Sequence, residues 1–442
     1  MTQTVSAPPA TWSPPAAPAA SSGAPQQQPP ARKPHGVVNI FFYGTPGRMR
    51  ALLILTAVVA VLFGLAAAQG FRQSDGALKR AEANTAQLVR VQAIHTNLVA
   101  ANADATNAFL VGGLEPPAQR QHFVDSLATA SRLIAEAATA QPADQTVLGA
   151  LNQTLLTYNG QIEQARTNNR QGLPIGSQYL KDANATLQNE SLPLLNALVT
   201  ANEDRVRVEF NGVGRGNIWL IVGGLISLAV LVLTMVWLAK RTHRYLNVPL
   251  VVGAVLVLLT MVVGGAGLAG ASSSARDTRA DEYTDALALA QARIAAYDAK
   301  SNESLTLIAR GSGSDFETAW KSAAARVDKQ LAAIGSGAGS AASAWQQYKA
   351  AHVAIRSADD SGKWDDAVDR AIGTGAGSAT TPFTTFDKAS ASTLGVSSDA
   401  AQQNLADARG SLPPIGWLGL PIGIAAALLA AWGLSQRLGE YR

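Results

Sequence analysis

The sequence predicts an all-α membrane protein with four transmembrane helices and two extracytoplasmic four-helix-bundle domains, related by internal duplication. Three observations predict this class. Four long windows contain no charged residue, the segments between them show helical spacing without strand-like alternation, and the two long polar segments share one pattern of spaced residues. Only 15% of the 442 residues are charged, whereas 48% are hydrophobic. A wholly soluble chain usually carries more charge than this.

The four uncharged windows are long enough to cross a membrane. They cover residues 51–68, 217–239, 248–270 and 412–434. At about 1.5 Å of rise per residue, helices of 18 to 23 residues span roughly the 30 Å hydrocarbon core of a bilayer. With their flanking residues, the transmembrane helices are expected at 48–69, 216–239, 248–270 and 412–434.

The basic residues predict which side of the membrane each segment faces. Residues 1–50, the short connector 240–247 and the tail 435–442 together hold nine basic residues and one acidic residue. The long segments 70–215 and 271–411 hold 12 basic against 13 acidic and 14 basic against 17 acidic residues. Because short cytoplasmic segments are enriched in Lys and Arg, we expect a multi-pass protein of the cell membrane with both termini and the connector in the cytoplasm. The pI of about 9.3 then reflects topology rather than nucleic-acid binding.

The chain begins with a segment that is rich in Pro, Ala, Gln and Ser. This composition predicts a disordered, proline-rich cytoplasmic tail over residues 1–47. The tail is interpreted as a spacer, with a proline-rich docking peptide as the alternative. The polar segment before the first span is much longer than the n-region of a signal peptide. An uncleaved membrane anchor is therefore favoured over a cleaved signal peptide for this span.

The first long polar segment, 70–215, predicts four helices. They are expected to run from the membrane to Phe109, over 118–140, from Asp144 to Arg170, and from a break at 172–176 into the second span. Pro193 is expected to kink the fourth helix. One apolar seam steps alternately by three and four residues, the spacing of an antiparallel bundle. It comprises Leu148, Leu151, Leu155, Tyr158, Ile162 and Ala165.

The second long polar segment, 271–411, repeats this plan. Tyr158, Arg166, Gly172 and Pro193 lie at offsets 0, 8, 14 and 35, and their counterparts at offsets 0, 8, 14 and 34 are Tyr348, Arg356, Gly362 and Pro382. The apolar seam has a counterpart as well. Leu155, Tyr158, Ile162 and Ala165 align with Trp345, Tyr348, His352 and Ile355. Upstream, Asn107 with Phe123 is paired with Asn302 and Phe316. We interpret these matches as a diverged internal duplication, in which a glycine-rich run at 373–377 interrupts the last helix of the second copy.

No pattern of residues predicts catalysis, a cofactor or a metal site. The chain contains no cysteine, which excludes disulfides and thiolate chemistry. The histidines do not have ligand spacing; they are His35, His95, His122, His243 and His352. His95 and His352 fall on apolar seams, where a hydrogen-bonded bundle histidine is favoured over a ligand. We therefore expect a protein that is not an enzyme.

The spans contain no ionisable residue, which disfavours a pump or coupled transporter. Gly419 and Gly423 form a GxxxG motif, interpreted as packing within the chain, with a homodimer face as the alternative. For Arg90, Arg166 and Arg356 a solvated side chain is the favoured interpretation, capture of a ligand carboxylate is the alternative, and no ligand pocket is predicted.

The connector holds the candidate site that the sequence favours. It carries Lys240, Arg241, His243 and Arg244 between the second and third spans. In the favoured interpretation, these basic residues stop the transfer of the chain across the membrane and contact anionic membrane lipids. Contact with a cytoplasmic partner protein is the functional alternative.

This layout resembles the GlnX-type membrane proteins of actinobacteria over essentially the whole chain. The shared features are a proline-rich inner tail, two pairs of spans that each bracket an outer four-helix domain, and little cytoplasmic mass. That family is associated with a periplasmic glutamate/aspartate-binding lipoprotein and a soluble cytoplasmic Ser/Thr kinase of the G type. The resemblance implies a relay of the loaded lipoprotein's state to the kinase. It supplies no residue motif.

The outer segments also resemble the four-helix sensor modules of chemoreceptors, although HAMP and output domains are missing, so output is expected to pass through a partner. Two other functions are alternatives. One is an accessory subunit of an envelope transport or assembly complex. The other is a direct small-molecule sensor.

Overall fold

The computed structural model describes residues 44–111, 114–242 and 246–439, and every element in these ranges is helical. In the first half of the chain the helices are α2 (Gly44–Val111), α3 (Pro117–Ala140), η1 (Pro142–Asp144), α4 (Gln145–Arg170), α5 (Ile175–Thr186), η2 (Leu187–Ser191), α6 (Leu192–Val213) and α7 (Gly216–Thr242). In the second half they are α8 (Val248–Ala280), α9 (Glu282–Ile308), α10 (Ser314–Ile334), η3 (Gly335–Ala338), α11 (Gly339–Asp360), α12 (Trp364–Ile372), α13 (Thr380–Gly410) and α14 (Ile415–Gly439).

Four helical runs are long and apolar enough to cross a membrane. They are Pro46–Val111, Ile175–Arg241, Val248–Ile308 and Thr380–Gly439, and each contains one of the predicted windows. Large apolar side chains on these windows are about half exposed, as expected of side chains that face lipid; Ile54, Val58 and Leu62 are examples on α2. The all-α membrane fold is therefore confirmed.

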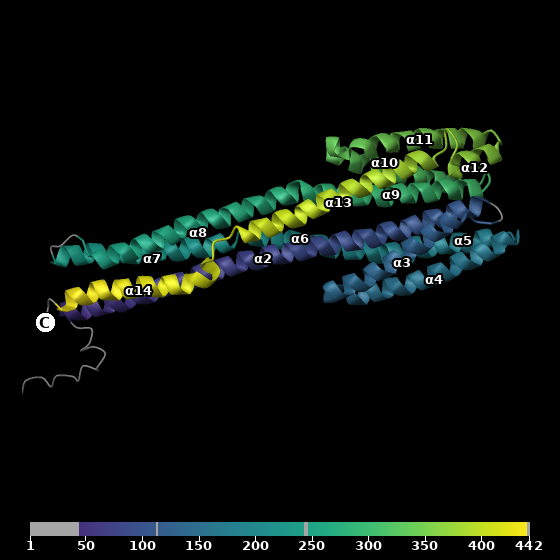
Figure 1. Ribbon diagram of the computed structural model, residues 1–442. Coiled ribbons are helices and arrows are strands. Elements are labelled where there is room, and N and C mark those ends of the chain that lie inside the picture. Colours follow the sequence, from purple (N-terminus) through teal and green to yellow (C-terminus); the bar gives the residue numbers. More distant parts are fainter. Residues whose placement is uncertain (1–43, 112–113, 243–245, 440–442) are drawn as a thin grey trace, which may run out of the picture.

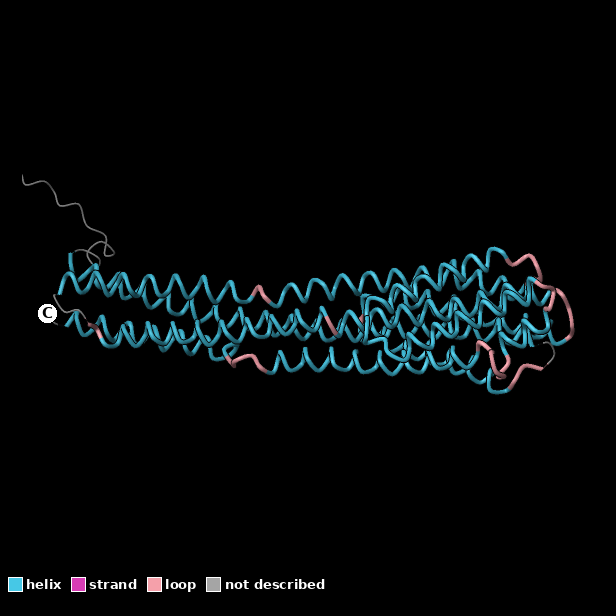
Figure 2. The backbone as a smooth tube through the Cα atoms, turned by 90° about the horizontal axis from the view of Figure 1, so that it is seen from above, coloured by secondary structure: helices cyan, strands magenta, loops and turns pink. Residues whose placement is uncertain are grey.

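The molecule is a long rod with the spans at one end and two helical lobes at the other (Figure 1). We name residues 70–213 distal lobe 1 and residues 271–411 distal lobe 2. Seen from above, the helices run nearly parallel to the long axis of the rod (Figure 2). The lobes meet along α2 and α9, which both lead away from the spans. Asn102 Nδ2 donates to Ser301 Oγ at 2.7 Å in this contact.

Each lobe is a four-helix bundle with its own core. The predicted seam of α4 is buried from Leu148 to Ala165, and in lobe 2 Trp345, Tyr348 and Ile355 are fully buried. A fully buried Leu or Ile contributes about 1.5–3 kcal/mol. The matched seams of the two segments are thus both buried, and the internal duplication stays a prediction. The counterpart of Phe123 differs from the prediction, however, because Phe123 on α3 and Trp320 on α10 each lie six residues after the start of their helix. Phe316 packs instead against the core of lobe 1.

Glycine allows close helix contacts in the membrane region. A Cβ on Gly64 would lie 2.5 Å from the Gly419 carbonyl oxygen and 2.8 Å from the Gly423 Cα. The predicted GxxxG motif therefore packs α14 against α2 of the same chain. Near the lobes, a Cβ on Gly70 would lie 2.5 Å from the Gly216 carbonyl oxygen, so α2 and α7 also touch through their backbones.

Several predicted boundaries move. The fourth span starts at Ile415 rather than at 412, because Pro413 and Pro414 precede the helix. Helix α2 already begins at Gly44, since Pro46 is tolerated in a first helical turn, so residues 44–47 are not a disordered tail. The rest of that predicted tail lies outside the described residues.

Proline acts differently in the two lobes. The predicted kink at Pro193 coincides with a five-residue π-helix, η2, directly before it. Proline has no N–H to donate to the preceding turn, so a π-helical turn there relieves the missing bond. Its counterpart Pro382 lies in the first turn of α13, because the glycine-rich run ends α12 at Ile372, as the predicted interruption of the last helix requires.

Candidate functional site

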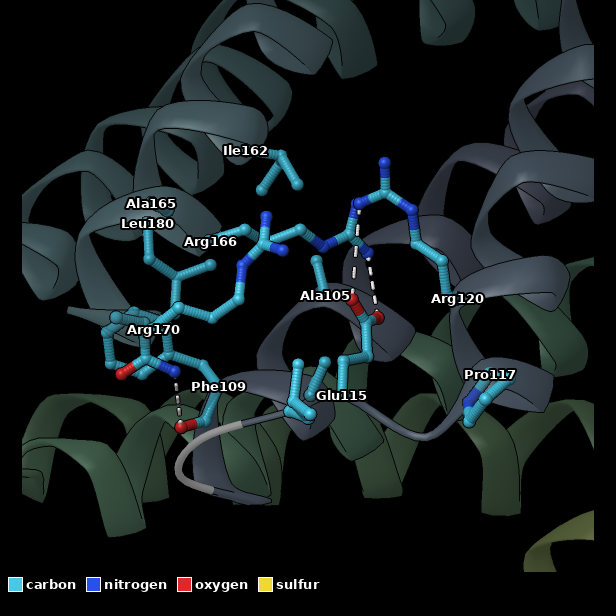
Figure 3. A pocket seen from close by; sticks show the side chains of 13 residues that line it. Ala105, Phe109, Glu115, Pro117, Arg120, Ile162, Ala165, Arg166, Arg170 and Leu180 are labelled. Carbon is cyan, nitrogen blue, oxygen red and sulfur yellow. Dashed lines mark hydrogen bonds and ion pairs between the residues drawn. The ribbon is translucent and has the colours of Figure 1, made fainter. Parts of the chain in front are cut away.

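A cleft of about 360 Å³ lies at the tip of lobe 1, near the end of α2. Figure 3 shows the side chains that line it. Its apolar wall comes from the ends of α2 and α4 and from α5; it includes Ala105, Phe109, Ile162 and Leu180. Its polar groups are Glu115, Arg120, Arg166 and Arg170. The Asn169 amide donates to the Phe109 carbonyl oxygen at 3.2 Å, which ties the end of α4 to the end of α2.

Arg166 is the most buried of the charged groups that line this cleft. Its side chain is only 9% exposed, and its guanidinium lies 4.0 Å above the centre of the Phe123 ring. It contacts Glu115 at 3.0 Å and Glu163 at 3.2 Å. Among the described residues its Nε has no hydrogen-bond partner. Burial lowers the pKa of Arg166, although the nearby Glu115 opposes this shift; an arginine stays protonated in either case.

The charge of the cleft favours an anion. Arg120 shares both carboxylates with Arg166, at 3.0 Å from Glu163 and 4.0 Å from Glu115. Arg170 stands exposed at the cleft with no partner among the described residues. Three guanidinium groups thus line a cleft that contains one carboxylate. A ligand carboxylate could pair with Arg170 and replace Glu163 on Arg120, because guanidinium groups bind carboxylates in a planar, bidentate fashion.

Lobe 2 has a cleft at the equivalent place, but its charge is reversed. This cleft of about 630 Å³ is lined by Arg310 and Arg356 together with Glu317, Asp359 and Asp360. Arg356 donates to Asp359 and to Asp360, each at 2.6 Å. Its guanidinium is therefore already occupied by neighbouring carboxylates. Both tips thus carry a cleft with an arginine at the matched position, and the two clefts differ in size and in charge.

A buried ionic cluster lies in lobe 2. Lys300 Nζ contacts Glu303 Oε1 at 2.6 Å and donates to the Ala371 carbonyl oxygen at 2.7 Å. His352 contacts Glu303 at 2.8 Å and Glu317 at 3.2 Å through its two ring nitrogens. The indole of Trp320 stacks on His352 with ring centres 3.5 Å apart. His352 is thus a hydrogen-bonded bundle histidine, as predicted.

The cluster shifts the pKa values of its own members. Burial lowers the pKa of His352, but its hydrogen bonds to Glu303 and Glu317 outweigh this effect, so the pKa lies above its ordinary value of 6.5. Burial raises the pKa of Glu303, but Lys300 and His352 outweigh it, so this pKa lies below its ordinary value of 4.5. The pKa of Glu317 is also lowered, because His352 and Lys321 outweigh burial.

These shifts predict how the stability of lobe 2 depends on pH. The contribution of His352 is complete below pH 6.5 and is lost as the pH rises through its folded-state pKa. The contributions of Glu303 and Glu317 are complete above pH 4.5 and are lost as the pH falls through their folded-state pKa values. The melting temperature of lobe 2 should therefore decline on both sides of this window. His352→Gln should flatten the decline on the alkaline side, and melting curves of both proteins from pH 4 to pH 9 check this.

His95 corrects another prediction. It is buried, as expected of a seam residue, but its Nε2 has no hydrogen-bond partner among the described residues. Burial lowers the pKa of His95 to about 4, so the ring is neutral at pH 7. It lines a cavity of about 410 Å³ between the lobes, together with Gln92, Gln188 and Asp298. The apolar seam predicts that His95 is buried, but it cannot predict that the ring lacks a hydrogen-bond partner.

The structure separates the other predicted site residues. Arg166 and Arg356 line different clefts, and Arg90 contacts Gln87 along α2 at 3.3 Å. Lys240 and Arg241 belong to helix α7 and not to a loop, since α7 continues to Thr242. His243 and Arg244 lie outside the described residues. Contact of these four residues with lipid or a partner stays a prediction.

Sequence reasoning missed several residues that the structure brings together. Glu115, Arg120 and Arg170 come from a loop and two helices, and no spacing links them. Lys300 and Glu303 offered a signal, because an i, i+3 pair of opposite charges stands in a helix that is otherwise mostly small and apolar. No group of three His, Asp or Glu in the described ranges is placed to hold a metal ion.

Lobe 1 is similar to a known family of protein domains. A family model described as an actinobacterial sensor domain matches residues 77–211. These residues contain the whole Arg166 cleft and nearly all of lobe 1. Neither a curated protein nor a solved structure matches the chain. The protein is therefore a multi-pass membrane protein that carries a sensor domain on its first pair of spans, which indicates a role in sensing or signalling.

Proposed function

We propose that this protein is a non-enzymatic transmembrane signal transducer whose distal lobes receive the signal. One observation carries the proposal. Helix α2 is a single helix of 68 residues that contains the first span and also supplies Ala105 and Phe109 to the lobe 1 cleft. A displacement at the cleft can therefore travel to the other end of the membrane as a tilt, rotation or slide of one helix.

We further propose that the lobes lie outside the cell membrane and that both termini and the connector lie in the cytoplasm. The basic excess at the span ends opposite the lobes supports this orientation. Leu156→Cys and Val353→Cys each place a thiol on a lobe, at positions that are 69% and 67% exposed. Both should react with a membrane-impermeant maleimide in intact cells. Ser435→Cys is the matched control at the opposite end, and it should react only after permeabilisation. Labelling in the reverse pattern would overturn the orientation.

A more specific form of this proposal is a relay between two partner proteins. The resemblance to GlnX-type proteins supports a solute-binding lipoprotein that recognises glutamate or aspartate as the input and a soluble Ser/Thr kinase as the output. The paired lobes offer a broad, two-part receiving surface for such a lipoprotein. Lys240, Arg241, His243 and Arg244 are the proposed contact for the kinase or for membrane lipids.

Cross-linking in native membranes with and without glutamate or aspartate tests the relay. We expect the full chain to recover both partners, with the amino acid changing the yield of the lipoprotein. Recovery of neither partner in any condition contradicts the relay. Recovery of a transport ATPase or an envelope-assembly factor instead favours the accessory-subunit alternative. The mass of the cross-linked product also tests the homodimer alternative.

Direct sensing is a second candidate, and the lobe 1 cleft is the observation that favours it. The cleft should take a small molecule that carries at least one carboxylate or other anionic group. Thermal shift of the purified full chain with a panel of dicarboxylic acids tests this. Arg170→Gln should abolish any stabilisation that the panel produces, whereas Arg132→Gln should not. Arg132 is the matched control because it lies on α3 in an exposed ion pair with Glu136. Absence of any shift across the panel would remove this candidate.

A further inference from the structure

Helices α2 and α7 enclose an apolar groove at the end of the spans opposite the lobes. The groove has a volume of about 620 Å³. Its α2 side contains Leu52 and Leu55, and its α7 side contains Leu233, Val236 and Trp237. Leu233 is 67% exposed and Leu55 is 48% exposed, so both face the groove and its surroundings rather than the bundle core.

The groove follows from how the two helices cross. Near the lobes, α2 and α7 touch through backbone at Gly70 and Gly216, and a Cβ on Gly223 would lie 3.0 Å from Ala66. Toward the opposite end, larger residues line the space between the helices, among them Leu52 on α2 and Leu233 and Trp237 on α7. Small residues therefore bring the two helices into backbone contact near the lobes, and the groove lies where the residues are larger.

The length of the groove matches one leaflet of a bilayer. From Val230 to Lys240 the α7 side covers about 15 Å at 1.5 Å per residue, which is about half of the 30 Å hydrocarbon thickness. Trp237 lies near the charged end, at the depth where tryptophan prefers the headgroup boundary. An acyl chain from the leaflet opposite the lobes would fit this depth.

Two cations close the headgroup end of the groove. Arg48 on α2 and Lys240 on α7 both line it, and neither pairs with another described residue. Among the described residues, no carboxylate lines the groove. An apolar slot one leaflet deep, with two free cations at its outer rim, has the chemistry that an anionic phospholipid requires.

We propose that the groove between α2 and α7 binds an anionic phospholipid, with one acyl chain between the helices and the phosphate between Arg48 and Lys240. A zwitterionic phospholipid has the same chains but carries an additional positive charge, which the two cations disfavour. The lipid would hold α2 and α7 at a fixed separation at this end of the rod. For Lys240 this proposal rests on the membrane-lipid form of the contact proposed above, and it does not depend on the identity of the sensor ligand.

Native mass spectrometry of the detergent-purified full chain tests the proposal. The probes are phosphatidylglycerol and phosphatidylcholine with identical palmitoyl and oleoyl chains. The wild type should retain phosphatidylglycerol in preference to phosphatidylcholine. Each basic residue near a membrane surface contributes about fivefold to the binding of an anionic lipid, so the double variant Arg48→Gln/Lys240→Gln should bind phosphatidylglycerol roughly 30-fold more weakly. Each single variant should show an intermediate loss.

The control variant removes the same charge from neighbouring positions. Arg50→Gln/Arg437→Gln changes basic residues at the same end of the spans, on α2 and α14, that do not line the groove. It should keep the preference for phosphatidylglycerol. An equal loss in the test and control variants, or no loss in either, would overturn the site.

A second measurement locates the acyl chain. Dibrominated phosphatidylglycerol should quench the fluorescence of Trp237 more strongly than dibrominated phosphatidylcholine does. The difference in quenching between the wild type and Trp237→Phe isolates this tryptophan from the other seven. Equal quenching of Trp237 by both lipids would mean that the groove takes bulk lipid without selecting a headgroup, and it would refute the proposal.

Discussion

Replacing Glu303 with alanine should lower the unfolding free energy of distal lobe 2 by about 3–5 kcal/mol, the usual cost of removing one partner of a buried ion pair. The Glu303 side chain is only 1% exposed, and it contacts both Lys300 at 2.6 Å and His352 at 2.8 Å. Without the carboxylate, the Lys300 ammonium is buried with a single backbone acceptor. That uncompensated charge is the source of the expected loss.

Thermal unfolding of the full chain in detergent, followed by far-UV circular dichroism, measures this effect. Glu136→Ala is the control, since Glu136 forms an exposed ion pair with Arg132 that is worth about 0–1 kcal/mol. The double variant Lys300→Met/Glu303→Gln should lose less than Glu303→Ala, because it removes the buried charge and keeps a hydrogen bond to His352. If Glu303→Ala melts like Glu136→Ala, the cluster does not stabilise the lobe.

Gly64→Leu should separate α2 from α14. Any side chain at this position collides with backbone, because a Cβ would already lie 2.5 Å from the Gly419 carbonyl oxygen. Backbone atoms cannot rotate away as a side chain can, so the helices must move apart. Overpacking of this kind costs about 1–3 kcal/mol or more. Since α2 also lines the lobe 1 cleft, the displacement should extend from the membrane toward the lobes.

Thiol cross-linking between α2 and α13 measures how far this displacement extends toward the lobes. The chain contains no cysteine, so an engineered pair reports alone. Asp75 on α2 and Arg409 on α13 form an ion pair at 3.0 Å, and cysteines at these two positions should be joined efficiently by a short bifunctional maleimide. Gly64→Leu should reduce this yield strongly. Gly270→Leu should not, because no atom lies within 4 Å of the position where its Cβ would be. Equal yields in both variants would contradict the proposed packing.

The long-range plan of the fold could be predicted from sequence because it depends on repeated, additive signals. Uncharged windows give the spans, and the seam that contains Tyr158 and its counterpart Tyr348 gives two bundles. Local signals located the breaks near Pro142 and Gly172 within a few residues. The start of α14 at Ile415 was missed, because hydropathy counts Leu412 as part of a span whereas the following prolines decide where the helix begins.

The site chemistry was predictable only in part. Arg166 and Arg356 were recognised as candidate carboxylate receptors, but the sequence could not show that Arg356 is occupied by Asp359 and Asp360. The partners of a guanidinium depend on how helix ends meet in space, and spacing along one helix does not report that. The presence of Arg48 and Lys240 in the same groove was missed for the same reason.

Placing both lobes on one polypeptide has an evolutionary consequence. In a receptor built from two identical subunits, every substitution appears twice, so both binding surfaces change together. Here the Arg166 cleft and the Arg356 cleft have accumulated opposite charge while α2 and α9 still hold their lobes in a fixed one-to-one pairing. Because the two tips occupy separate parts of one chain, a substitution at one tip leaves the other tip unchanged.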